Sequence, residues 1–109
     1  MIMRFCQTLD LKNDAYLIEE YKRYHQMVWP EVRDFIRSCG ILSMEIYCYG
    51  TRLVMIMETN EHFSFQQMAE RGKENAKVQE WEKLMSNFQQ PLPGAKEGEK
   101  WVLMEKIYS

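Results

Sequence analysis

The sequence lacks an excess of charge of either sign. Its 109 residues carry 14 Lys and Arg against 16 Asp and Glu, a formal net charge of −2. Nucleic-acid-binding domains present a basic face, and polybasic membrane segments and acidic tails are blocks of like charge. The mixed signs here follow neither pattern, so we expect no nucleic-acid or charged-membrane partner.

Long hydrophobic runs are also missing. The longest stretch without a charged side chain is Leu84 to Ala95, and it contains two prolines. A transmembrane helix needs about 20 apolar residues. Arg4 and Asp10 interrupt the beginning of the chain, which leaves no apolar region of secretory-signal length there. We expect neither a membrane span nor an export signal.

Cysteine is scarce and follows no ligand pattern. Cys6, Cys39 and Cys48 are an odd number without a Cys-x-x-Cys pair, so they form neither a disulfide framework nor a zinc-binding pattern. Phosphate-binding Gly-rich loops, dinucleotide fingerprints, His-Glu-x-x-His and nucleophile elbows are absent as well. The simplest interpretation is a reduced, cytoplasmic protein without a metal site.

Hydrophobic residues make up 46% of the chain, enough for one core, and the apolar spacing switches between strand and helix periods. A helix is expected from Ala15, and it stops or kinks at Trp29-Pro30 before a second piece that ends at Cys39-Gly40. The other predicted elements are strands Met3–Leu9, Ile41–Tyr49, Arg52–Thr59 and Trp101–Tyr108, and helical residues 62–71 and 75–88 in one helix or two separated near Gly72.

The order strand, helix, strand, strand, helix, strand is the split βαβ arrangement of the ferredoxin-like fold. It predicts a single α+β domain over residues 1–109, with a four-stranded antiparallel sheet and helices on one face. Alternation places apolar side chains on both faces of the strands. Since soluble monomers rarely expose a large apolar face, we expect a homodimer with the sheets face to face, a dimeric α/β barrel.

The segment Tyr21 to Glu31 holds the most informative polar residues. Tyr21 and His25 are four residues apart and therefore share one face of the predicted helix. One interpretation is a core histidine packed beside a tyrosine. The other is a proton-transfer pair, because histidine titrates near neutral pH.

Two further aromatic residues have a structural and a functional interpretation. Tyr47 and Glu45 share a face of the predicted strand Ile41–Tyr49, where they either pack on the sheet or reach a small ligand. Trp81 lies on the inward stripe of the helical residues 75–88, as a core side chain or as a flat surface for the apolar face of a sugar ring.

Taken together, these residues resemble the L-rhamnose mutarotase family. The motif is Glu20-Tyr21-x-x-x-His25-x-x-x-Trp29-Pro30-Glu31, to which the strand Glu45-Ile46-Tyr47 and Trp81 are added. The resemblance covers nearly the whole chain. It implies a small dimeric ferredoxin-like enzyme, an isomerase that interconverts the α and β anomers of a deoxyhexose by ring opening and reclosure.

By the resemblance, the enzyme uses no cofactor or metal, and its partners are a small-molecule sugar and a second copy of the chain. His25 would be the main acid/base residue, Tyr21 and Tyr47 would bind the sugar, and Trp81 would pack on its ring. Well-known family members have a second tryptophan where this chain has Glu82. That departure leaves the sugar open between L-rhamnose, the first choice, and L-fucose.

A different class of function stays open on fold alone. Ferredoxin-like dimers of this size also serve as cofactor-independent small monooxygenases and as ligand-sensing modules. The His25-x-x-x-Trp29-Pro30-Glu31 motif favours the mutarotase.

Overall fold

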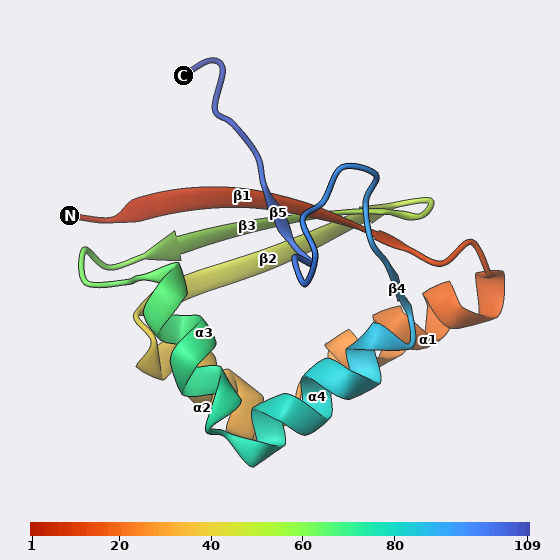
Figure 1. The fold of residues 1–109 in the computed structure, drawn as a ribbon, viewed down its shortest axis with the longest axis horizontal. Helices are drawn as coiled ribbons and strands as arrows, with labels where there is room; N and C mark the ends of the chain where they lie inside the picture. The colour runs from red at the N-terminus through yellow and green to blue at the C-terminus, as the bar shows by residue number, and fades with distance from the viewer.

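The computed structural model describes all 109 residues, Met1 to Ser109. Strand β1 (Met3–Leu11) leads to helices α1 (Ala15–Gln26) and α2 (Pro30–Ser38), then strands β2 (Ile41–Tyr49) and β3 (Arg52–Thr59), helices α3 (Phe65–Lys73) and α4 (Ala76–Ser86), and the short strands β4 (Gln89–Gln90) and β5 (Val102–Leu103). The antiparallel sheet has the order β2-β3-β1-β4, with β5 also paired to β1. The helices lie on one face (Figure 1). The expected α+β class and ferredoxin-like order are confirmed, with β4 and β5 sharing the fourth strand position.

The first two helices begin where the sequence predicts, but α1 ends at Gln26, three residues before the expected stop at Trp29-Pro30. The Asp14 side chain accepts a hydrogen bond from the Leu17 amide at 3.0 Å and caps α1. Pro30 is the first residue of α2, where its missing N–H costs no helical hydrogen bond. After α2 the chain reverses at Gly40, whose φ of 97° favours glycine and whose missing Cβ leaves room for the Asn60 side chain.

The second helical region is two helices rather than one. Helix α3 ends at Lys73, and α4 begins at Ala76 after Asn75, whose side chain accepts from the Val78 amide at 3.1 Å. Gly72 precedes the last residue of α3, where an added Cβ would make an ordinary van der Waals contact with the Phe35 ring at 3.6 Å.

The prediction of a strand over Trp101–Tyr108 is wrong for most of these residues. Only Val102 and Leu103 pair with β1, and Met104 adds one hydrogen bond from its amide to the Cys6 carbonyl at 2.8 Å. Residues 105–109 then leave the sheet and are exposed (Figure 1). Alternating apolar residues can form a strand only where a neighbouring strand takes up the backbone hydrogen bonds, and beyond Met104 the chain turns away from β1.

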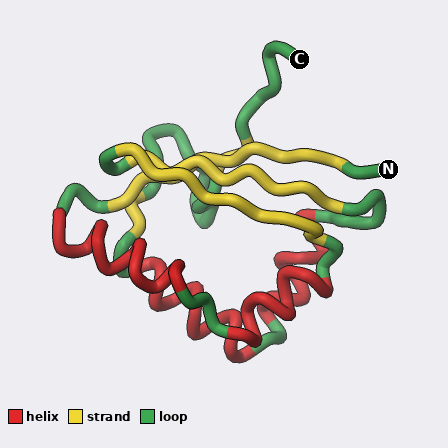
Figure 2. Tube along the Cα trace, turned by 180° about the vertical axis from the view of Figure 1, so that it is seen from behind, coloured by secondary structure: helices red, strands yellow, loops and turns green.

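The helices form a V against the sheet, with its two ends near the sheet and its apex away from it (Figure 2). Two buried clusters fill this space. One joins α1, α2 and α4 to β1 and β3, and its buried members are Leu11, Tyr21, Val32, Leu53, Trp81, Met85 and Phe88. The other lies nearer α3 and comprises Ile41, Met55, Met57 and Phe63. The cavity described next is lined by members of both clusters.

Candidate active site

A cavity of about 250 Å³ lies between the helices and the inner face of the sheet. Hydrophobic side chains provide 15 of its 19 lining residues, and the other four are Gln7, His25, Glu82 and Gln89. Pockets for drug-sized ligands usually measure about 300–1,000 Å³. This apolar cavity with a few polar groups therefore suits a smaller molecule.

His25 is a neutral imidazole in the cavity wall. Its Nδ1 lies 2.8 Å from the Tyr21 carbonyl oxygen, one helical turn earlier. A carbonyl oxygen only accepts, so Nδ1 carries the proton and the lone pair of Nε2 is left available. Burial lowers the pKa of His25 below its usual 6.5, although the hydrogen bond to Tyr21 opposes this shift. At neutral pH the side chain is therefore an uncharged imidazole that can take up a proton.

Tyr21 stands beside His25 as a protonated phenol. The two rings lie 4.4 Å apart, and the Tyr21 side chain is almost completely buried. Burial raises the pKa of Tyr21 to about 12 and outweighs the hydrogen bond from Gln89, which lowers it. A base that is neutral and an acid that stays protonated thus lie side by side, one turn apart on α1.

Trp81 supplies an aromatic wall from α4. Its ring is 5.7 Å from the His25 ring and 5.2 Å from the Trp29 ring, in edge-to-face geometry. The side chain is buried and also lines the cavity. Trp81 is therefore a core residue and a cavity residue at once, and its two interpretations from the sequence do not exclude each other. The structure brings His25, Tyr21 and Trp81 together around one space.

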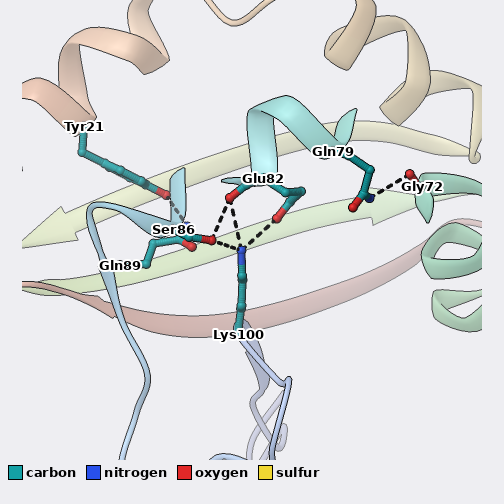
Figure 3. Close-up of polar contacts among 7 residues, drawn as sticks. All are labelled: Tyr21, Gly72, Gln79, Glu82, Ser86, Gln89 and Lys100. Atoms are coloured by element: carbon teal, nitrogen blue, oxygen red, sulfur yellow. Dashed lines mark hydrogen bonds and ion pairs between the residues drawn. The ribbon is translucent and has the colours of Figure 1, made fainter. Parts of the chain in front are cut away.

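Glu82 brings a carboxylate to the same cavity, next to Trp81. Lys100 approaches it from the loop before β5, with Nζ 3.4 Å from Glu82 Oε2 and 3.3 Å from the Glu82 carbonyl oxygen (Figure 3). The Lys100 ammonium also donates to the Ser86 hydroxyl. These contacts attach the loop to the end of α4. Lys100 directly precedes Trp101, which lines the cavity as well.

Tyr47 does not reach this cavity within the chain. Met44 and Ile46 of β2 line it, so alternation directs Tyr47 to the opposite face of the sheet. There its hydroxyl donates to Glu45 Oε2 at 3.3 Å, and 56% of the residue is exposed. The sequence pattern correctly groups Tyr47 with Glu45, but their face is the one without helices. The structure thus does not bring Tyr47 together with His25, Tyr21 and Trp81.

Gln89 is a cavity residue that the sequence analysis missed. It lies in β4, which is too short for any periodic pattern to predict. Gln7, on the inner face of β1, was missed as well. A glutamine in a single sequence has no spacing signal comparable to that of Tyr21 and His25. Only the fold reveals that these amides face the cavity.

The structure contains no group of three or more His, Cys, Asp or Glu side chains that could hold a metal ion. It also contains no helix long and apolar enough to span a membrane. Within the cavity, the polar chemistry comes from His25, Tyr21, Glu82, Gln7 and Gln89.

The fold and the cavity define a small α+β protein with a histidine and a tyrosine side by side in a mostly apolar pocket. The family model for L-rhamnose mutarotase matches residues 4–109. An L-fucose mutarotase of Xanthomonas campestris pv. campestris is 41% identical over 110 residues, which cover 99% of this chain and 88% of that protein. A UPF0734 protein of Dictyostelium discoideum is 41% identical over 111 residues, covering 95% of this chain and 86% of that protein.

The crystal structure of an L-rhamnose mutarotase from Formosa agariphila has the same fold, with a TM-score of 0.73 at 16% identity, covering 98% of this chain and 97% of that one. The chain belongs to the L-rhamnose mutarotase family. Membership confirms the expected isomerase class, that of a mutarotase, and does not favour the monooxygenase or ligand-sensing alternatives.

Proposed function

We propose that this chain interconverts the α and β anomers of a 6-deoxyhexose, L-fucose or L-rhamnose, in the cavity around His25. The observation that carries the proposal is the neutral imidazole of His25 beside the protonated phenol of Tyr21. Mutarotation needs one group that removes a proton and another that supplies one. The names of the relatives support both sugars as candidates.

The reaction follows from the two protonation states. Nε2 of His25 takes the proton of the anomeric hydroxyl, the bond between C1 and the ring oxygen breaks, and C1 becomes an aldehyde. The Tyr21 hydroxyl gives its proton to the ring oxygen as that bond breaks. After rotation about the C1–C2 bond, the reverse proton transfers close the ring on the other face. No atom is gained or lost, and both residues return to their starting states.

The remaining walls leave the aldehyde room to turn. Most of the lining is apolar, and it is rich in methionine: Met44, Met55, Met57, Met68 and Met85. Such flexible side chains adapt to a moving ligand and suit the 6-methyl group of a deoxyhexose. Trp81 would pack against the apolar face of the sugar ring. An uncharged substrate also agrees with a chain that has little net charge.

We further propose that the single domain of residues 1–109 acts as a homodimer. The face of the sheet opposite the helices carries no helix in Figure 1, and the end of the chain extends from that side. Tyr47 and Met104 on this face are 56% and 45% exposed, and Ile107 and Tyr108 in the C-terminal tail are about nine-tenths exposed. A second copy packed on this face would cover apolar area that soluble monomers rarely expose. Tyr47 would then be an interface residue.

A cytoplasmic location belongs to the same proposal. Cys6, Cys39 and Cys48 are free thiols. Free cysteines persist most readily in a reducing compartment. Fractionation of the native host cells would test this location directly.

Anomer-exchange NMR tests the proposed activity. Selective saturation of the anomeric proton of one anomer should reduce the signal of the other when the protein is added to L-fucose or L-rhamnose. Both sugars are measured in parallel, and D-glucose, which carries a hydroxyl group at C6, serves as the comparison. Exchange no faster than in buffer for both deoxy sugars would refute the function.

A further inference from the structure

The Gln89 side chain carries the one buried side-chain oxygen or nitrogen atom of the structure that has no hydrogen-bond partner, Oε1. Only 8% of the residue is exposed. Its Nε2 donates to the Tyr21 hydroxyl oxygen at 3.4 Å, and its Oε1 has no hydrogen-bond partner (Figure 3). The backbone of Gln89 is paired in β4 with Leu11 of β1, so the strand fixes the position from which the Gln89 side chain extends.

A buried acceptor without a donor destabilises a folded protein, because the group has lost its water and gained nothing in return. Folded proteins leave few such groups, and each one calls for a reason. Here the group lines the cavity and lies next to Tyr21. A hydroxylated ligand in this cavity would bring the donor that Gln89 Oε1 lacks.

The direction of the existing hydrogen bond matters for Tyr21. When Gln89 Nε2 donates to the phenol oxygen, the phenol proton is free to point at a ligand. If the amide were reversed, Tyr21 would donate to Gln89, and its proton would be unavailable for the sugar. Either orientation of the amide leaves one of its ends unpaired. Only the observed orientation leaves both a free acceptor and a free phenolic proton.

We propose that Gln89 is a substrate-binding and positioning residue: its amide oxygen accepts a hydrogen bond from a sugar hydroxyl other than that at C1, and its amide NH₂ holds the Tyr21 hydroxyl with the proton directed at the ring oxygen. This inference rests on the proposed mutarotase function and adds a contact that selects the sugar. L-Fucose and L-rhamnose differ in configuration at C2 and C4, so a contact with either of these hydroxyls would distinguish them.

The test is Gln89→Met, which keeps the length of the side chain and removes both polar ends. Gln90→Met is the matched control, because Gln90 follows in the same strand, is exposed and does not line the cavity. NMR exchange rates at several sugar concentrations give kcat and KM for both sugars, and thermal melting gives Tm. We expect Gln89→Met to raise KM by about tenfold to a hundredfold, the range for leaving a sugar hydroxyl unpaired in a buried site, and to lower kcat through Tyr21.

Stability separates this role from a structural one. Gln89→Met removes the unsatisfied amide oxygen, which is stabilising, and the hydrogen bond to the Tyr21 hydroxyl, which costs about 1 kcal/mol. The two effects oppose each other, so the Tm should change little while activity falls. Gln89→Glu adds a second signature: the protonated carboxyl can donate to Tyr21 and accept from the sugar, whereas the ionised form cannot donate. The ionised form instead accepts the Tyr21 proton, so the kcat of Gln89→Glu relative to the wild type should fall as the pH rises.

Two results would overturn the assignment of Gln89 while the wild type is active: unchanged kcat and KM in Gln89→Met, or a large drop in Tm that accompanies the loss of activity. A wild-type protein that does not accelerate exchange would instead refute the proposed function. A substrate analogue that lacks the contacted hydroxyl should have the same KM with the wild type and with Gln89→Met. If Gln89→Met raises KM by the same factor whichever hydroxyl is removed from the sugar, a direct contact is contradicted.

Discussion

Replacing His25 by alanine should abolish most of the catalysed anomer exchange and leave the fold intact. The substitution removes the group whose free Nε2 accepts the anomeric proton. A positioned acid/base group typically contributes about 10²–10⁴-fold to a rate, so we expect kcat to fall within that range. Binding should persist, because Trp81, Tyr21 and the apolar walls are unchanged.

The cost in stability can be bounded from the contacts of His25. The substitution removes one hydrogen bond to the Tyr21 carbonyl and the ring contacts with Tyr21 and Trp81. A hydrogen bond and an aromatic contact each contribute about 1 kcal/mol. The loss of about 2–3 kcal/mol is smaller than the free energy of unfolding of a typical domain, about 5–15 kcal/mol. The variant should therefore stay folded with a lowered Tm.

The assay is saturation transfer between the two anomeric protons, with circular dichroism and thermal melting to verify the fold. His62→Ala is the matched control, since the His62 side chain is 84% exposed and lies outside the cavity. Its exchange rate should equal that of the wild type. Added imidazole should restore part of the activity of His25→Ala by occupying the vacated space. A folded His25→Ala protein with wild-type exchange would refute the assignment of His25 as the base.

Two further predictions follow from protonation and from the bare face of the sheet. The catalysed rate should fall on acidification only below about pH 6.5, because burial lowers the pKa of His25 and its protonated form cannot act as a base. The rate should stay level from pH 7 to 9, because the pKa of Tyr21 is about 12. A decline of the rate between pH 7 and 9 would contradict Tyr21 as the acid. Tyr47→Arg should convert the proposed dimer to a monomer in analytical ultracentrifugation, since two copies would bring like charges together on the shared face, whereas the conservative control Tyr47→Phe should stay dimeric; a monomeric wild type at micromolar concentration would contradict the dimer.

The juxtaposition of Tyr21 and His25 is the part of the candidate site that the sequence predicted well. Tyr21 and His25 are four residues apart on a helix, and that spacing alone places their side chains together. Trp81 was also predicted to face inward, because it recurs with Val78 and Met85 at helical spacing. Periodicity describes neighbours on one element, and these three residues needed little more than that.

Contacts between elements were harder to predict. Alternation in β2 separates Tyr47 from Ile46, but it does not say which of the two faces the helices cover. The apolar residues after Trp101 predicted a long strand, although pairing with β1 ends at Met104. Gln89 gave no signal, because a two-residue strand has no period and the importance of its amide depends on Tyr21, 68 residues away. Each of these outcomes is decided by long-range packing.

The placement of Tyr21 and His25 on a single helix has a consequence for how such a site can change over evolution. Their separation is set by one turn of α1, so it is preserved when helices shift relative to the sheet or to each other. The surfaces that would select the sugar come from elsewhere: Trp81 and Glu82 from α4, and Gln89 from β4. Under the proposed function, substitutions in α4 and β4 would therefore change the preferred sugar and leave the distance between Tyr21 and His25 unchanged.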